Sequence, residues 1–148
     1  MVGARAARTD FNQWITALVR WGDMDAFGHV NNAKYFTYCE SARIAYFEAL
    51  GIELDRSVIR HAPAVVTATC NFLRQVHHPA TLEVGARTTQ LGRSSFTLEY
   101  GIFLEGTDEL VADGSSVVVW VDYEAEKSAP LPEDLKRGIQ RIEGRDFA

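Results

Sequence analysis

The sequence has 148 residues, of which 47% are hydrophobic and 24% are charged, and its formal net charge is −5. This length and balance predict one globular domain, residues 13–148, and exclude a disordered or fibrous protein. The acidic balance disfavours general binding of nucleic acid, and no apolar stretch reaches the roughly 18 residues of a membrane-spanning helix. Residues 1–12 lack the apolar core of a secretory signal, and we expect a flexible tail there.

The cysteines and histidines point to a protein without disulfides or metals. Cys39 and Cys70 are too few for a disulfide framework and suit a reducing compartment, so we expect a cytoplasmic location. His61, His77 and His78 have no Asp, Cys or His at the spacing typical of metal ligands. We therefore predict no metal and no other cofactor.

The first half of the chain predicts a strand, a polar loop and a long helix. Apolar and polar residues alternate over residues 14–21, which indicates a strand, and a loop follows at 22–31. Residues 32–50 predict a helix that Gly51 ends. Its polar residues form one narrow face, and a helix apolar over the rest of its circumference is expected to be buried by other elements. That face consists of Lys34, Thr37, Ser41 and Glu48.

The second half predicts four more strands and a short amphipathic helix near its end. The strands are expected at residues 64–73, 81–91, 94–104 and 110–121, and the helix at about 131–142. The connections are too short for parallel crossovers, so antiparallel pairing is expected. The fold class is therefore α+β, with one antiparallel sheet curled over one helix. Such a sheet leaves open edge strands, which favour edge-to-edge dimerisation.

The loop before the long helix carries the densest set of polar groups. Free backbone N–H groups and the helix dipole at a helix start favour negative charge, such as the oxyanion that forms during acyl transfer. A carboxylate a few residues earlier can attack the carbonyl or activate water, which is what ester or thioester hydrolysis needs. Asp and Asn before a helix are also its usual capping residues, so spacing alone leaves capping and catalysis both open.

Residues 20–36 (RWGDMDAFGHVNNAKYF) resemble the hot-dog-fold acyl-CoA thioesterases of the 4-hydroxybenzoyl-CoA thioesterase type. In that family a strand ends in an Asp-x-Asp pair, and a Gly-His/Val-Val-Asn-x-x-x-Tyr pattern opens the central helix. The His-Val-Asn-Asn variant is also similar to acyl-acyl-carrier-protein thioesterases. The resemblance extends from about residue 16 to 142 and includes a weaker glycine-serine match at 91–96 and a proline-rich one at 127–131.

The resemblance implies a hot-dog fold, with a five- to six-stranded antiparallel sheet wrapped round one central helix. It also implies a homodimer or homotetramer with active sites at the subunit interface, and an acyl-CoA or acyl-carrier-protein substrate. The His-Val-Asn-Asn segment departs from the hydroxybenzoyl enzyme and favours a fatty or other aliphatic acyl group. We expect that group to lie along the helix among Tyr35, Phe36 and Tyr38.

Site residues are carried over from the family by position. Asp25 matches the catalytic carboxylate, and the backbone N–H near Asn32 matches the group that polarises the thioester carbonyl. Gly28 matches the turn glycine and Tyr35 the recurring helix tyrosine, whereas Asp23 is expected to be a turn residue. A second group sits where family members contact the CoA or carrier arm across the interface, namely Gly92, Arg93, Ser94 and Ser95.

Four roles stay open at this point. His29 either orients Asp25 or a water, or bonds the backbone, and Asn31 either positions the water or caps the helix. Glu40 is a competing carboxylate, because a second hot-dog subfamily uses a helix glutamate. Its alternative is an ion pair with Arg43, which lies on the apolar side of the helix and needs a partner. Three arginines, Arg74, Arg87 and Arg93, are either phosphate contacts or solvated surface residues.

Two other functions remain possible for this fold. One is a non-catalytic module that binds acyl thioesters. The other is a hydratase or dehydratase, which would use a differently placed Asp–His pair. Analysis of the products separates the three, because only the thioesterase releases a free thiol.

Overall fold

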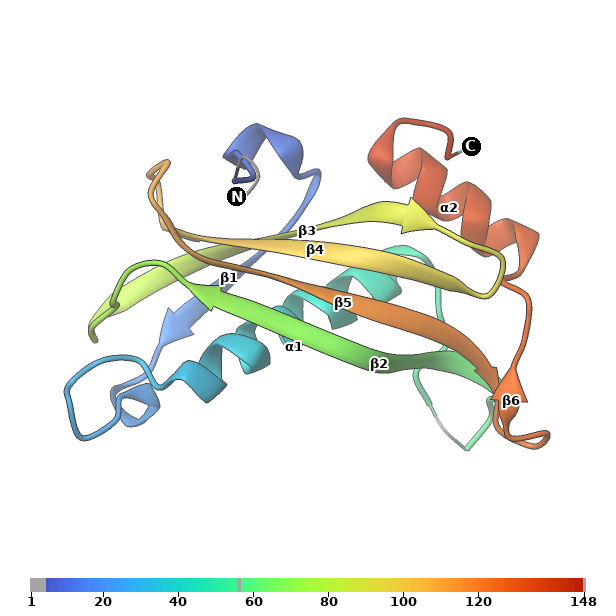
Figure 1. The fold of residues 1–148 in the computed structure, drawn as a ribbon, viewed down its shortest axis with the longest axis horizontal. Coiled ribbons are helices and arrows are strands. Elements are labelled where there is room, and N and C mark those ends of the chain that lie inside the picture. The colour runs from blue at the N-terminus through green and yellow to red at the C-terminus, as the bar shows by residue number, and fades with distance from the viewer. Residues whose placement is uncertain (1–4, 56, 148) are drawn as a thin grey trace.

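A six-stranded antiparallel sheet curls around the helix α1 (Asn32–Ala49), which is the hot-dog fold that the family resemblance implied (Figure 1). The computed structural model describes residues 5–55 and 57–147. From edge to edge the strands are β1 (Gln13–Val19), β3 (Ala80–Leu91), β4 (Ser95–Leu104), β5 (Leu110–Asp122) and β2 (His61–Phe72), and β6 (Lys127–Ser128) pairs with β5. The remaining elements are α2 (Glu133–Glu143) and two 3₁₀ turns, η1 (Arg8–Asp10) and η2 (Trp21–Asp23).

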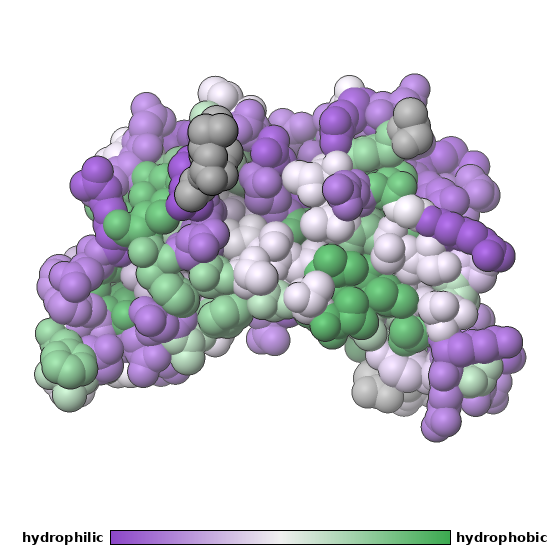
Figure 2. Space-filling view, viewed as in Figure 1, coloured by the Kyte–Doolittle hydropathy of each residue, from purple (hydrophilic) through white to green (hydrophobic). Residues whose placement is uncertain are grey.

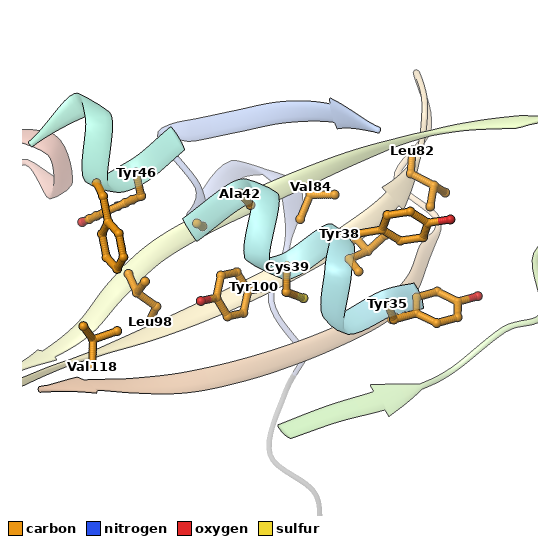
Figure 3. Close-up of a cluster of buried hydrophobic side chains, with 14 of the residues drawn as sticks. Tyr35, Tyr38, Cys39, Ala42, Tyr46, Leu82, Val84, Leu98, Tyr100 and Val118 are labelled. Atoms are coloured by element: carbon orange, nitrogen blue, oxygen red, sulfur yellow. The ribbon is translucent and has the colours of Figure 1, made fainter. Parts of the chain in front are cut away.

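The core lies between α1 and the concave face of the sheet. Side chains of α1 that are at most 6% exposed meet inward-facing residues of β3, β4 and β5 (Figure 3). From the helix these are Tyr35, Tyr38, Cys39, Ala42 and Tyr46, and from the sheet Leu82, Val84, Leu98, Tyr100 and Val118. Each fully buried Val, Leu or aromatic side chain contributes about 1.5–3 kcal/mol to folding.

The helix is buried less completely than its sequence predicts. Phe36 is 40% exposed and Ile44 is 37% exposed, and Phe36 lies beside Phe72 at the end of β2 with their ring centroids 6.5 Å apart. The helix therefore has one closed flank and one flank, next to β2, that this chain leaves partly uncovered.

The N-terminal segment packs on the outer face of the sheet. Phe11 is 4% exposed, and its ring lies over Gly85 and Gly101, where a Cβ would come within 3 Å of it. Trp14 meets the same ring edge-on at 5.6 Å. Residues 5–12 thus make contacts that a flexible tail is not expected to make, while residues 1–4 of that predicted tail lie outside the described residues.

Helix α2 closes the fold over the C-terminal end of α1. Tyr46 donates a hydrogen bond of 2.6 Å to Glu143 of α2 and lies 2.8 Å from the Thr88 hydroxyl of β3. Glu143 also accepts the Thr88 backbone N–H. This buried polar cluster ties three elements together at the end of α1 that is far from the Asp25 loop (Figure 1).

Strand β2 forms an open edge of the sheet. Among the described residues its one partner strand is β5, and a bulge interrupts the ladder between Val65 and Thr67. Val65 is 41% exposed and Val66 is 60% exposed, and Figure 2 shows hydrophobic side chains gathered on the face where β2 runs. Unpaired strand edges with apolar side chains favour association with another strand.

Both cysteines are free thiols, with Cys39 buried and Cys70 partly buried. Within 5–55 and 57–147, neither helix has the length and apolar character that crossing a membrane requires.

Candidate active site

The loop between β1 and α1 folds into a tight turn around Asp25. The Asp25 N–H donates to the His29 carbonyl at 2.8 Å, and the Gly28 N–H donates to the Asp25 carbonyl at 3.0 Å. Gly28 has a φ of +80°, in the left-handed region where residues with a Cβ are strained. No other atom would crowd a Cβ there, so backbone conformation is the reason for glycine at this position.

The Asp25 carboxylate is exposed and borders a cavity of about 260 Å³ at the start of α1. Its Oδ1 atom accepts the Phe27 backbone N–H at 2.9 Å, and no other hydrogen bond reaches this carboxylate from the described residues. His29, Asn32 and Phe72 line the same cavity. One carboxylate oxygen is therefore held by the turn while the other is free to meet a substrate or a water.

The start of α1 supplies a hydrogen-bond donor to that cavity. Asn31 caps the helix, because its side chain accepts the Ala33 N–H at 2.9 Å and its own N–H is bonded to the Asp23 carbonyl. This geometry favours the capping role of Asn31. The Asn32 N–H has no partner within 5–55 and 57–147, and Asn32 lines the cavity. A carbonyl oxygen placed there would gain a donor at the positive end of a helix dipole.

Asp23 faces the interior, as expected of a turn residue. It is 7% exposed, and its Oδ2 accepts the Arg20 N–H at 3.0 Å and the Tyr38 hydroxyl at 2.7 Å. Burial alone would raise the pKa of Asp23, but the bonds from Arg20 and Tyr38 and the nearby Lys34 ammonium lower it below its usual value. Burial and the bond to Asp23 raise the pKa of Tyr38 well above its usual range.

The tyrosines near the cavity divide into one that lines it and one that does not. Tyr35 is 2% exposed, borders the cavity and packs against Phe72 at 5.4 Å, and burial raises the pKa of its hydroxyl. Tyr38 was expected beside the acyl group, but it lines neither this cavity nor the second one because its hydroxyl is bonded to Asp23. Phe36 lines the second cavity.

The His29 side chain borders the cavity, and the contact of His29 with Asp25 is made through its backbone carbonyl. No hydrogen bond joins their side chains in the part of the chain that the structure describes. The His29 ring instead meets His77, which precedes β3, edge-on with centroids 5.0 Å apart. His77 in turn places Nδ1 2.7 Å from the Gly28 carbonyl oxygen. No signal in the sequence could have revealed this contact, because the two residues are 49 positions apart and His77 belongs to no recognisable motif.

The competing carboxylate Glu40 lies beside a second cavity, of about 220 Å³, between α1, β2, β4 and β5. Its Oε2 is 3.8 Å from Arg43, so the predicted ion pair is present. Arg43 also donates to the Tyr100 hydroxyl at 3.3 Å and to the Ser116 hydroxyl at 3.4 Å. Glu40 is in the middle of α1, where helix N–H groups are already bonded, so it has no free helix N–H beside it, whereas Asp25 shares its cavity with Asn32.

The second group of predicted residues lies at the other end of the sheet. The β1–β3 ladder places Val19, and hence the start of the Asp25 loop, beside Ala80 at the beginning of β3. The turn at 92–95 follows Leu91 at the end of that 12-residue strand (Figure 1). Within one chain the Asp25 cavity therefore contains none of the four residues of this group, Gly92, Arg93, Ser94 and Ser95.

The three candidate phosphate contacts are also separated. Arg74 borders the Asp25 cavity and pairs with Glu109 at 3.0 Å, with its own side chain 64% exposed. Arg87 is bonded to Glu99 at 2.8 Å on the outer face. Arg93 belongs to the distant turn, where its carbonyl accepts the Leu131 N–H. Arg74 is the cation placed to meet a ligand at this cavity.

Comparison with known proteins shows the family. Residues 19–139 match the model of the thioesterase-like superfamily. The chain is 34% identical to the uncharacterized protein YsmA of Bacillus subtilis, over 89% of this chain and 88% of that one. It is 33% identical to the 1,4-dihydroxy-2-naphthoyl-CoA hydrolase of Synechococcus elongatus, over 83% and 91%.

A solved structure agrees with these relatives. The thioesterase of Thermus thermophilus, crystallised with coenzyme A and zinc, is 34% identical with a TM-score of 0.81, covering 93% of this chain and 98% of that one. No group of three or more His, Cys, Asp or Glu residues able to hold a metal ion occurs in residues 5–55 and 57–147 of this chain. The curled sheet, the carboxylate before the helix start and the match over residues 19–139 together place this chain in the thioesterase-like superfamily, as a thioester hydrolase.

Proposed function

We propose that the chain hydrolyses an acyl-CoA thioester to a free acid and CoA, with Asp25 as the reacting carboxylate. The observation that carries this proposal is the cavity where the exposed Asp25 carboxylate and the unpartnered Asn32 N–H lie together. The relative from Synechococcus elongatus is named for hydrolysis of a CoA thioester, and the Thermus thermophilus relative was solved with coenzyme A, which supports CoA as the leaving group.

In the proposed reaction the thioester carbonyl oxygen accepts the Asn32 N–H at the helix start. Asp25 either removes a proton from the water that attacks the carbonyl carbon, or attacks that carbon itself to form an anhydride that water then cleaves. In both routes the carbon–sulfur bond breaks and the CoA thiolate leaves. In the first route the thiolate takes up the proton that Asp25 removed from the water, and in the second it takes up a proton released when water cleaves the anhydride to the free acid and the Asp25 carboxylate. A positioned general base contributes roughly 10² to 10⁴ in rate, and one oxyanion donor about 10² to 10³.

We place the acyl group in the space between α1 and β2. Residues of α1 and of β2 line both the Asp25 cavity and the second cavity. Phe72 lines the first and Phe36 the second, and their ring centroids are 6.5 Å apart. Aromatic side chains of this kind suit an apolar acyl group, aliphatic as the sequence favours or aromatic as in the Synechococcus relative. Arg74 at the cavity rim is then the contact for a CoA phosphate.

The substitution Asp25→Asn tests the proposed catalytic role. It removes the negative charge while keeping an oxygen that can accept the Phe27 N–H. We expect kcat for thiol release to fall by roughly 10²-fold or more, because amide groups neither accept a water proton nor attack a thioester. Thiol release should be followed with short, long and aromatic acyl-CoAs, and the products should be identified as free acid and CoA.

The matched control for this test is Asp108→Asn. Asp108 has a side chain 96% exposed and lies outside the Asp25 cavity, so this variant should keep wild-type activity. Both variants should unfold at the wild-type temperature. An Asp25→Asn enzyme with near-normal thiol release would reject the assignment. A wild-type protein that binds acyl-CoA without releasing thiol would instead indicate a binding module, and a hydroxyacyl thioester product would indicate a hydratase.

We further propose that two copies join through the open edge of β2, and that two such dimers form the homotetramer. Support comes from the unpaired edge and from exposed apolar residues beside it, including Val65, Val66 and Phe72. Because Phe72 also lines the Asp25 cavity, such an interface would enclose the cavity. The turn at 92–95 of the second copy would then be the group that meets the CoA arm. The two free thiols support a cytoplasmic location.

Sedimentation equilibrium tests this assembly. The wild type should have a mass that is two or four times the chain mass of 16.5 kDa. Val66→Lys places a charge on the β2 edge and should shift the mass toward the single chain. Leu18→Lys is the matched control, because Leu18 is 69% exposed on the opposite edge strand, β1. A wild-type mass of one chain, or dimers that persist equally in both variants, would contradict the β2 interface.

A further inference from the structure

The connection between β2 and β3 holds the Asp25 loop from the side. The Val30 N–H donates to the Val76 carbonyl at 2.9 Å, and the His78 N–H lies 3.4 Å from the Met24 sulfur. Between these backbone contacts, the His77 side chain reaches the Gly28 carbonyl with Nδ1 at 2.7 Å. The connection thus contacts the loop at its beginning, at its turn and at its end.

The hydrogen bond between His77 and Gly28 fixes the tautomer of the neutral His77 ring. A carbonyl oxygen only accepts hydrogen bonds, so Nδ1 of His77 must carry the hydrogen and donate it. In the neutral ring Nε2 is then the unprotonated nitrogen. The imidazolium form also carries a hydrogen on Nδ1, so the bond to Gly28 survives protonation of the ring.

The Gly28 carbonyl is closely linked to the position of the Asp25 carboxylate. The Gly28 N–H is bonded to the Asp25 carbonyl, and the Phe27 N–H is bonded to Asp25 Oδ1. Gly28 adopts a positive φ, and a glycine has the widest choice of alternative backbone conformations. A contact from outside the loop, such as that of His77, therefore adds to the bonds that keep the Gly28–His29 peptide in one orientation.

The same ring also limits the movement of His29. The two imidazoles meet at an interplanar angle of 66° with their centroids 5.0 Å apart, and His29 borders the Asp25 cavity. Within the described residues no hydrogen bond joins the His29 side chain to the Asp25 carboxylate, so the ring contact with His77 is one of the contacts that limit the position of the His29 ring.

We propose that His77 is a positioning residue for thioester hydrolysis, which holds the Asp25 turn by donating from Nδ1 to the Gly28 carbonyl. This inference rests on the proposed function of Asp25. His77 does not border the Asp25 cavity, so it acts through Gly28 and His29 rather than on the substrate. A displacement of about 1 Å in a reacting group can lower the rate by about 10²-fold, so a small movement of this turn is sufficient to matter.

Three substitutions at position 77 separate the hydrogen bond from the bulk of the ring. His77→Asn places an amide nitrogen about where Nδ1 lies, His77→Gln places it about where Nε2 lies, and His77→Phe keeps a ring without a donor. We expect kcat to fall about 10- to 100-fold in the Phe and Gln variants and to stay within about 3-fold of wild type in the Asn variant. KM and the unfolding temperature should stay at wild-type values in all three.

A Phe variant with wild-type kcat would overturn the proposal. An Asn variant as slow as the Phe variant would also overturn it, because the donor at the Nδ1 position would then not be what matters. If all three variants unfolded at a lower temperature than the wild type, His77 would have a purely structural role, and the proposal would again be overturned.

A second measurement does not depend on activity, so it remains valid if the proposed function fails. Long-range ¹H–¹⁵N NMR of the wild type should show His77 protonated on Nδ1 at neutral and alkaline pH. Hydrogen exchange at the Gly28 and Asp25 amides should be faster in the Phe variant and normal in the Asn variant. An unprotonated Nδ1, or hydrogen exchange that is unaltered in the Phe variant, would show that His77 does not hold the Asp25 turn. This conclusion would apply whatever substrate the enzyme hydrolyses.

Discussion

Asp23 and Asp25 stand two positions apart in one loop, yet they have opposite surroundings. Asp23 points under the start of α1, is 7% exposed, and receives hydrogen bonds from Arg20 and Tyr38. Asp25 points outward beside a cavity, and the Phe27 N–H is its single hydrogen-bond donor in the described chain. The Asp23 carboxylate is therefore engaged in hydrogen bonds within the fold, whereas the Asp25 carboxylate has an oxygen free to bind a water or a ligand.

These opposite surroundings fit a loop in which Asp23 stabilises the fold and Asp25 has the reacting role that we propose. A buried carboxylate with several donors anchors its segment, and the anchor here joins η2 to the first turns of α1 through Tyr38. Asp23 fixes the start of the loop through its two hydrogen bonds. Asp25 can therefore keep its position although its carboxylate accepts a single hydrogen bond. Residues that are poorly satisfied in the folded state are the ones free to exchange their hydrogen bonds with a substrate.

The two flanks of α1 repeat the same contrast on a larger scale. The flank that faces β3 and β4 is closed by residues such as Tyr46 and Leu98, which are fully buried. The flank that faces β2 contains both cavities and the partly exposed Phe36 and Phe72. The open flank begins at the Asn32 N–H, so the proposed reacting groups and the proposed acyl position lie on the same side of the helix.

The largest effect on stability should come from Asp23→Asn. This change turns a charged acceptor into a neutral amide and leaves the buried Tyr38 hydroxyl and Arg20 N–H with a weaker partner. Hydrogen bonds to charged groups contribute about 1.5–3 kcal/mol, so we expect the free energy of unfolding to fall by about 2 kcal/mol. For a protein of this size that lowers the melting temperature by about 4–8 °C in a calorimetric scan.

Asp25→Asn is the matched partner of that experiment. Its carboxylate has one backbone donor, which an amide oxygen can keep, and it is exposed to solvent. We expect its melting temperature to equal that of the wild type. If the two variants melted together, the division of the loop into an anchoring and a reacting carboxylate would be wrong.

Local spacing was sufficient to predict the helix α1 and the closeness of Asp25 to its start. The helix begins beside Asn31 and ends before Gly51 as predicted, because its capping residue and its C-terminal glycine are encoded next to it. Asp25 and Asn32 share a cavity as predicted, because only a short turn separates them. The catalytic role of Asp25 itself remains a prediction.

Contacts between distant segments were beyond the reach of the sequence. Helical periodicity marks Tyr38 as inward-facing but does not say that it meets Asp23 rather than an acyl group. Arg43 was predicted to pair with Glu40, three positions away, but its bonds to Tyr100 and Ser116 span 57 and 73 positions. The short strand β6 was also not predicted, because two residues carry no periodicity.

The smallest effect should appear in how the free energy of unfolding depends on pH. It again tests the difference between the hydrogen-bonded Asp23 and the exposed Asp25. The pKa of Asp23 is lowered in the folded protein, because donors from Arg20 and Tyr38 outweigh the effect of burial. A carboxyl group with a lowered folded pKa stabilises the fold above its unfolded pKa of about 3.9, and this contribution is lost as pH falls through the folded pKa.

The gap in unfolding free energy between wild type and Asp23→Asn should therefore narrow as pH falls below about 4, measured by urea unfolding at each pH. Other carboxyl groups with a lowered pKa also titrate in this range, notably Asp122, whose bonds to Arg60 bring its pKa to about 2. They are present in both proteins, so their contribution cancels in the difference. A gap that stayed constant down to about pH 2 would mean that Asp23 is held by packing rather than by its charge.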